Sequence, residues 1–312
     1  MPAGSHIVMM SIVEEPDDKC ASCGIAANND IKLKTCNSCN LVKYCGVECQ
    51  KDHRQQHKRA CKMRAAEIRD EILFRQPESS HVGDCPICCL PLPLDGRKVF
   101  MSPCCAKRIC IGCNFANVKR ESQASQKDNK CAFCRTAFVA TVEEQDLNLM
   151  KRVKVNDPSA LFKMGVRCQL RRNYESAFEY YTKAVELGDA HAHFQLSCLY
   201  RKGQGVEKDE KKELHHLEEA AIAGHPVARH NLGCYEGMNG RMERAVKHFI
   251  IAANLGYDDS IKGLKEYYAN GQVSKEDFAA ALRAHKAAVD ATKSPQREEG
   301  EFMYMMYGRK DH

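Results

Sequence analysis

Residues 20–61 read CASCGIAANNDIKLKTCNSCNLVKYCGVECQKDHRQQHKRAC. Eight residues of the types that bind zinc form four close pairs in this stretch: Cys20 and Cys23, Cys36 and Cys39, Cys45 and Cys49, and His57 and Cys61. Eight soft ligands in four pairs predict two tetrahedral zinc sites. A segment this short buries too little apolar surface to fold by itself, so we expect metal binding to supply its folding free energy.

The spacing alone leaves open whether neighbouring pairs or alternate pairs share a site. The segment resembles a MYND zinc finger in three motifs: CNSC (36–39), YCGVECQ (44–50) and HKRAC (57–61). The resemblance implies a protein-interaction module with interleaved sites, one formed by Cys20, Cys23, Cys45 and Cys49 and the other by Cys36, Cys39, His57 and Cys61. One departure concerns the usual peptide-binding surface, since His53 stands where members often carry Trp and the chain contains no Trp.

A second cysteine-rich stretch covers residues 84–137 and contains the motifs CPIC (85–88), PCCAKRICIGC (103–113) and CAFCR (131–135). These motifs resemble an all-cysteine variant of the RING finger. The resemblance implies one zinc site formed by Cys85, Cys88, Cys110 and Cys113 and a second formed by Cys104, Cys105, Cys131 and Cys134. The stretch departs from the common pattern because two of these cysteines are adjacent and Ala132 stands where Pro is usual. Cys89 is a further candidate that could replace one of the adjacent pair.

The RING resemblance also implies an activity. RING fingers bind a ubiquitin-conjugating enzyme and hold its thioester in a reactive geometry, without a covalent catalytic residue. By position in the motif, Ile87 would contact the conjugating enzyme, and Phe115 or Val118 would extend the apolar groove. Arg135 would supply a planar cation that bridges the conjugating enzyme and ubiquitin. The structural alternative is that Ile87 is a core residue and Arg135 a surface charge.

The composition indicates the cellular compartment of the protein and the class of partner that it binds. Of 19 cysteines, 16 lie at or before Cys134, and the N-terminal residues contain no secretory signal pattern. We therefore expect a reduced, intracellular protein, cytoplasmic or nuclear, with no membrane association. The formal charge is +6. If fifteen thiolates bound four zinc ions, fifteen negative charges would be offset by eight positive ones, and the net charge would be about −1. A nucleic-acid partner is thus disfavoured.

From Ala160 onward the sequence repeats itself. Gly188, Gly224 and Gly256 recur at intervals of 36 and 32 residues, at positions suited to helix C-termini. Aligned columns of small and apolar residues accompany them: Ala184, Ala220 and Ala252; Ala160, Ala192, Ala228 and Ser260; and Met164, Leu196, Leu232 and Leu264. A period in the thirties predicts a solenoid of helical hairpins. The stretch from Leu196 to Gly224 resembles Sel-one-like repeats, relatives of the tetratricopeptide repeat, which implies a surface for binding proteins or peptides.

The expected fold class is a multidomain chain, with two small zinc-stabilised domains followed by an all-α helical-hairpin solenoid. The expected segments are a disordered N-terminus (1–19), a MYND finger (20–61), a helical linker (62–83), a RING-like finger (84–137), a linker (138–157), the repeats (158–290) and a C-terminal tail (291–312). The tail is left open between a docking segment and a disordered end.

Two functions are compatible with this organisation. The first is a RING-type ubiquitin ligase whose MYND finger and repeats recruit the substrate, with four zinc ions per chain and a conjugating enzyme as partner. The second is a scaffold without enzymatic activity that joins partner proteins through the same surfaces.

Overall fold

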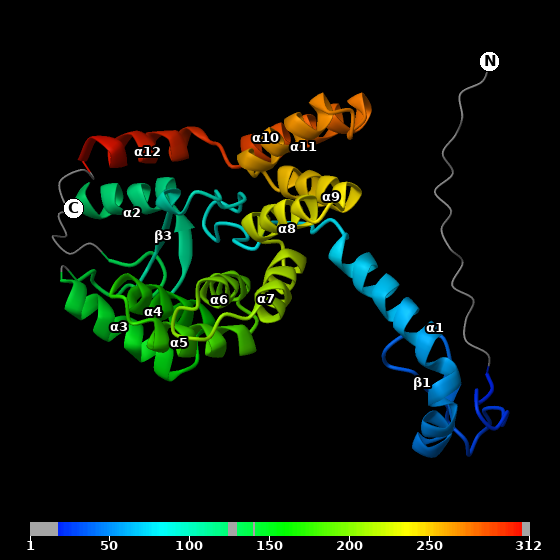
Figure 1. Ribbon diagram of the computed structural model, residues 1–312. Helices are drawn as coiled ribbons and strands as arrows, with labels where there is room; N and C mark the ends of the chain where they lie inside the picture. Colours follow the sequence, from blue (N-terminus) through cyan, green and yellow to red (C-terminus); the bar gives the residue numbers. More distant parts are fainter. Residues whose placement is uncertain (1–17, 124–129, 140, 308–312) are drawn as a thin grey trace. The chain divides into compact units, whose positions relative to one another are not determined.

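The computed structural model describes residues 18–123, 130–139 and 141–307 and divides into two compact units, Met1–Leu73 and Phe74–His312 (Figure 1). Within the described residues, no helix combines the length and the apolar character that crossing a membrane requires.

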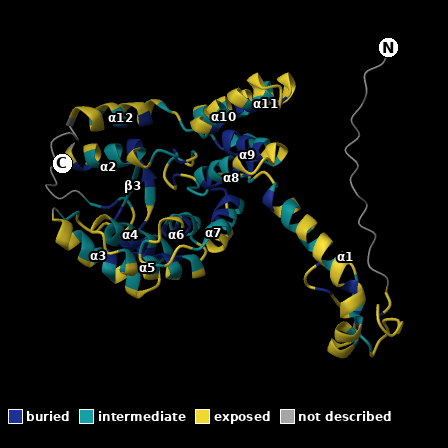
Figure 2. Ribbon diagram, viewed as in Figure 1, coloured by how far each residue is buried: buried dark blue, intermediate teal, exposed yellow. Residues whose placement is uncertain are grey.

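The first unit is built around its cysteines. Strands β1 (Lys34–Thr35) and β2 (Lys43–Tyr44) pair antiparallel, and helix α1 (Val47–Leu73) follows. The buried cluster consists of three cysteines and Tyr44, and most of α1 is exposed or only half-buried (Figure 2). With so small an apolar core, this unit depends on its ligand groups for stability.

Near the start of the second unit lies the second cysteine cluster, by which we mean residues 84–137. It contains strands β3 (Val99–Met101) and β4 (Arg108–Cys110), which pair antiparallel, and helix α2 (Ile111–Gln123). A 3₁₀ turn (Gly96–Lys98) precedes β3. Its core again combines cysteines with a few apolar side chains, among them Leu92 and Ile109.

Eight helices then form antiparallel pairs in a solenoid. They are α4 (Pro158–Leu170), α5 (Tyr174–Glu186), α6 (Ala190–Lys202), α7 (Glu210–Ile222), α8 (Pro226–Met238), α9 (Met242–Asn254), α10 (Asp258–Ala269) and α11 (Lys275–Ala291). Gly188, Gly224 and Gly256 follow helix ends with φ of +83°, +82° and +87°, which confirms the predicted role at helix C-termini. Side chains of all three predicted repeat columns are buried, and the small columns are fully buried where the helices approach closely.

Two further helices flank the solenoid. Residues 138–157, which we expected to be a linker, contain helix α3 (Val142–Lys154), whose N-terminus is capped by the Thr141 side chain. Its Leu149 is fully buried with Ala106 and Met164, so the helix joins the second cysteine cluster to the solenoid. The expected tail contains helix α12 (Pro295–Tyr307), which lies alongside α2 (Figure 1). The predicted fold class, small cysteine-rich modules followed by a helical solenoid, is confirmed.

Candidate metal centres

The Cys-x₂-Cys motif of Cys110 and Cys113 spans the end of β4 and the start of α2, and the other four such motifs fold into the same tight turn. In each, the residue after the second cysteine has positive φ: Gly24 (75°), Asn40 (56°), Cys89 (54°) and Arg135 (59°). The backbone N–H of that residue donates to the carbonyl of the first cysteine, at 2.8 to 3.2 Å. The turn points both sulfur atoms of a motif to one side, which prepares the pair for a shared ion.

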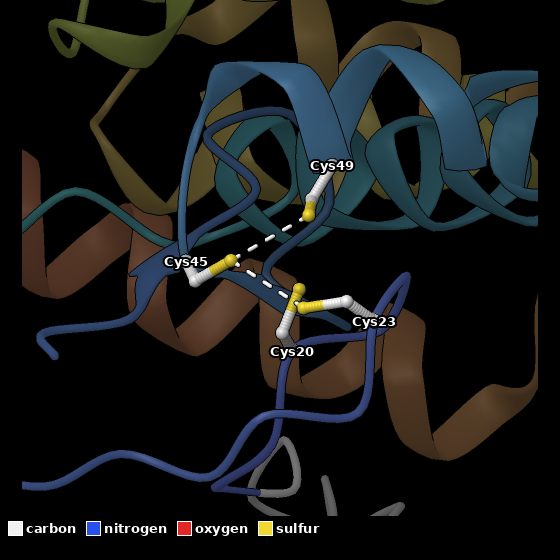
Figure 3. Close-up of side chains that lie close together, drawn as sticks. All are labelled: Cys20, Cys23, Cys45 and Cys49. Carbon is white, nitrogen blue, oxygen red and sulfur yellow. Dashed lines mark hydrogen bonds between the residues drawn. The ribbon is translucent and has the colours of Figure 1, made fainter.

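The first unit brings its eight candidate ligands together in two interleaved sets. Cys20, Cys23, Cys45 and Cys49 form one set. Figure 3 shows their sulfur atoms turned toward one another, with 3.5 Å between the Sγ atoms of Cys23 and Cys45 and 3.5 Å between those of Cys45 and Cys49. Of the two pairings that the spacing left open, the structure therefore has the alternating one.

Helix α1 supplies half of the second set. Cys36 and Cys39 come from the loop beside the β1–β2 sheet, and His57 and Cys61 lie one turn apart on α1. The Sγ atoms of Cys36 and Cys61 are 3.9 Å apart, and Nε2 of His57 lies 3.2 Å from Sγ of Cys39. His53 is outside both sets, because its Nδ1 lies 3.1 Å from the Tyr44 hydroxyl.

The second cysteine cluster also forms two interleaved sets. Cys85, Cys88, Cys110 and Cys113 form the first, with 3.9 Å between the Sγ atoms of Cys88 and Cys110. Cys104, Cys105, Cys131 and Cys134 form the second, with 3.6 Å between Cys105 and Cys131 and 3.3 Å between Cys104 and Cys134. The two adjacent cysteines therefore reach the same set. Cys89 is exposed and belongs to neither, since it occupies the positive-φ position of its turn.

These separations fit a tetrahedral zinc ion. Zinc–sulfur bonds of about 2.3 Å at tetrahedral angles place two sulfur ligands about 3.8 Å apart. The pKa values of the thiols are also consistent with metal binding. Backbone N–H groups of Cys23 and Cys45 lower the pKa of Cys20 to about 6, whereas hydrogen bonds with Cys49 and Cys23 raise the pKa of Cys45 to about 12. An ionised cysteine thus disfavours ionisation of the neighbouring thiol, because the two negative charges repel each other. A divalent cation bound between them offsets that repulsion.

The three residues expected to contact a conjugating enzyme lie in different elements of the second cysteine cluster. Ile87 is in the first turn and is 44% exposed. Phe115 on α2 is half-buried, with the Lys119 ammonium 5.8 Å from its ring centre. Arg135 follows the last turn and donates to the carboxylate of Glu121 at 3.0 Å. Hydrogen bonding to Arg135 lowers the pKa of Glu121, so this carboxylate is ionised at neutral pH.

Sequence reasoning missed one exposed apolar residue of the second cysteine cluster. Phe133 occupies in its turn the position that Ile87 occupies in the first turn, two residues after the leading cysteine, and it is 36% exposed. The matching offsets were the available signal. Val118, the alternative to Phe115, instead lines a cavity of about 450 Å³ with Phe138 and Leu149.

A cluster of three histidines was also missed, because its members are far apart in the sequence. Nε2 of His81 lies 3.1 Å from Nδ1 of His191, and a nitrogen of His225 is within 4.8 Å of both. Nδ1 of His225, however, accepts a hydrogen bond from the Ala228 N–H and caps α8. A neutral imidazole that accepts through Nδ1 carries its proton on Nε2 and has no lone pair left for a metal. We therefore interpret the three residues as a packing cluster, not as a metal site.

Comparisons with known proteins match two parts of the chain. Residues 20–61 match the family model of the MYND finger, and residues 158–189, 190–225 and 226–257 each match the Sel1 repeat. A curated protein of Neisseria meningitidis serogroup B, itself described as uncharacterised, is 32% identical over 137 residues, or 43% of this chain. The chain spans only 29% of that relative's length.

Two solved structures are similar to about half of the chain. One is a Sel1 repeat protein from Oxalobacter formigenes, with 28% identity, a TM-score of 0.42 and coverage of 48% of this chain and 65% of that one. The other is c5321, described as a protective antigen of uropathogenic Escherichia coli with an SLR fold, with 24% identity, a TM-score of 0.39 and coverage of 54% and 37%. From the family matches and the geometry, the chain contains a zinc-binding MYND finger at residues 20–61 and a Sel1-repeat solenoid that includes residues 158–257.

Proposed function

We propose that this protein is a RING-type ubiquitin ligase whose MYND finger and Sel1 repeats recruit the substrate. MYND fingers and Sel1 repeats are generally protein-interaction modules, and proteins are therefore the partners of these two regions. The proposal adds that the second cysteine cluster is a RING-type finger holding two zinc ions, which brings the total to four per chain.

The observation that carries the proposal is the exposure of an apolar side chain in each of the two outer turns of the second cysteine cluster. Both turns present an apolar side chain to solvent at the same offset, Ile87 in one and Phe133 in the other. Arg135 directly follows the second turn, and its side chain remains about half exposed although it is paired with Glu121. Exposed apolar side chains and an exposed planar cation are residue types suited to binding another protein.

The chemistry required of these residues is positioning. The residues would bind the conjugating enzyme and restrict its thioester to geometries from which a substrate amine can attack. Zinc would supply the rigidity of the two turns. Arg135 would donate hydrogen bonds from its fork to acceptors on the bound enzyme or on ubiquitin. No residue of this chain forms a covalent intermediate in this scheme.

The test is a reconstituted reaction of the full chain, loaded with zinc, with activating enzyme, a panel of conjugating enzymes, ubiquitin and ATP. We expect ubiquitin chains to form and Ile87→Ala, Phe133→Ala and Arg135→Ala each to reduce their formation at least about tenfold, as the loss of an interface hot spot does. Met238→Ala is the matched control, because Met238 is an exposed apolar residue of the solenoid.

The second candidate is a scaffold without ligase activity. Two intramolecular contacts favour it, since Arg135 is already paired with Glu121 and Lys119 covers part of Phe115. If no conjugating enzyme in a broad panel is stimulated by protein that contains four zinc ions, the scaffold function replaces the ligase function.

A further inference from the structure

Helix α12 packs closely against the second cysteine cluster, about 180 residues away in the sequence. Gly112 of α2 and Gly300 of α12 face each other: a Cβ atom at Gly300 would lie 2.7 Å from the Gly112 Cα. Ion pairs border the contact, with 2.7 Å between Lys98 and Glu301 and 2.8 Å between Lys119 and Glu299. The helix is therefore fitted to this surface by shape and by charge.

The centre of the contact is Arg297, which is only 2% exposed. Its Nη1 donates to the carbonyls of Pro91 at 2.6 Å and Thr292 at 2.7 Å. Its Nη2 donates to the Leu90 carbonyl at 3.0 Å and to Sγ of Cys88 at 3.3 Å. Two of these acceptors, Leu90 and Pro91, belong to the turn that carries Cys85 and Cys88, so Arg297 fixes both the backbone and one sulfur of that turn.

Charge explains why a guanidinium should be buried here. Within residues 18–123, 130–139 and 141–307, no carboxylate forms an ion pair with Arg297, and the cysteine sulfurs are its anionic partners. An unpaired buried charge is strongly unfavourable. Four thiolates around one divalent zinc ion carry a net charge of −2 in the same buried place, so each charge compensates the other.

We propose that Arg297 and helix α12 are an integral part of the second zinc-binding module, in which Arg297 orients the Cys88 ligand and balances the charge of the four-cysteine site. The module is then discontinuous in sequence and consists of residues 84–137 together with α12. The inference rests on zinc binding by the second cysteine cluster, and it does not depend on ligase activity.

The first experiment compares zinc release from full-length variants in the presence of a chelator, monitored with a colorimetric zinc indicator. We expect Arg297→Met to release one of its four zinc ions about 10- to 100-fold faster than the wild type, the range typical for loss of an outer-shell partner. Arg297→Lys keeps the charge and should restore part of the difference. Glu299→Gln is the matched control on the same helix, because it removes only an exposed ion pair.

The second experiment separates the effect on the metal from general destabilisation. Hydrogen exchange followed by mass spectrometry should show α12 losing protection when zinc is removed, although α12 contains no metal ligand, while α5 to α9 remain protected. Gly300→Val, which pushes α12 away without altering Arg297, should accelerate the release of the same single zinc ion.

Three results would overturn the inference. A chain that binds only two zinc ions would show that the second cluster is not a metal site, and the RING-type proposal would fail with it. A chain with four zinc ions in which Arg297→Met and Glu299→Gln release metal at the same rate would reject the role of Arg297 alone. Unchanged exchange of α12 after zinc removal would show that the helix is not part of the module.

Discussion

At the scale of single residues, backbone conformation decides which cysteines can act as ligands. Cys89 follows Cys88 directly and cannot be distinguished from a ligand by composition. Its φ of +54° places it where Gly24 stands in the first turn of the chain, and its thiol is exposed. A non-glycine residue in this region costs of order 1 kcal/mol. The position is therefore a strained turn position, not a metal-binding one.

This assignment predicts the effect of Cys89→Gly. Because glycine adopts positive φ without strain, we expect the variant to be more stable by up to about 1 kcal/mol and to retain its full zinc content. Thermal unfolding and metal analysis would measure both. Cys88→Ser is the comparison, and it should lose one zinc ion. Loss of zinc from Cys89→Gly instead would mean that Cys89 is a ligand.

At the scale of elements, the repeats are held together by aromatic side chains that pack on glycines. Tyr181 of α5 lies against Gly165 of α4, and Phe249 of α9 lies against Gly233 of α8, two repeats later. At each glycine a Cβ atom would come within 3 Å of the ring. The absence of a side chain is thus what allows the two helices of a pair to approach.

Two glycines around the same ring provide a matched test. A Cβ at Gly233 would lie 2.8 Å from the Phe249 ring, whereas one at Gly263 would lie 3.6 Å away, an ordinary contact. We expect Gly233→Ala to destabilise the solenoid by about 1–3 kcal/mol through overpacking. Gly263→Ala should be neutral or stabilising by up to about 1 kcal/mol, because alanine favours a helix. Urea unfolding measures both, and equal effects would contradict this packing.

At the scale of the whole molecule, side chains from distant segments decide how the second unit is assembled. The repeat glycines and the cysteine pairs have local spacings, and they were sufficient to predict the solenoid and the four groups of candidate ligands that the structure brings together. The contact of Arg297 with Cys88 spans 209 residues, and that of His81 with His191 spans 110. No periodicity relates such residues, so neither contact could be predicted. Likewise, nothing in the local pattern of residues 138–157 revealed that Leu149 would be buried by the second cysteine cluster.

The histidine cluster makes the segment before Cys85 sensitive to pH. Burial, with a smaller effect from the Arg108 charge, lowers the pKa of His81 to about 4, and burial also lowers the pKa values of His191 and His225. Arg108 faces Asp189, whose own pKa is raised by burial. Because the packed histidines have depressed pKa values, their contribution is complete above about pH 6.5 and is lost as the pH falls toward 4.

Hydrogen exchange of the His81 backbone amide measures the stability of this cluster, because its N–H donates to the Gly224 carbonyl at 3.1 Å. Protonation of His81 alone should lower the free energy of local opening by about 1 kcal/mol between pH 7.5 and 5.5. Hydrogen exchange at His81, corrected for the intrinsic rate at each pH, measures this value. His81→Phe keeps the aromatic packing but removes the titrating group. In this variant the free energy of local opening at residue 81 should change less with pH. A wild-type protection factor that does not change with pH would contradict the cluster's role.

The distance along the chain between α2 and α12 also sets an order of events during synthesis. The residues that meet in the contact, Gly112 and Gln296, are 184 positions apart. At 5–20 residues per second, a ribosome needs about 10 to 40 s to travel from one to the other. During that interval the Cys88 turn has emerged but has no cationic partner. The four cysteines around it are therefore completed as a site only when α12 has been made, and a chain terminated before Arg297 would carry this site without its counter-charge.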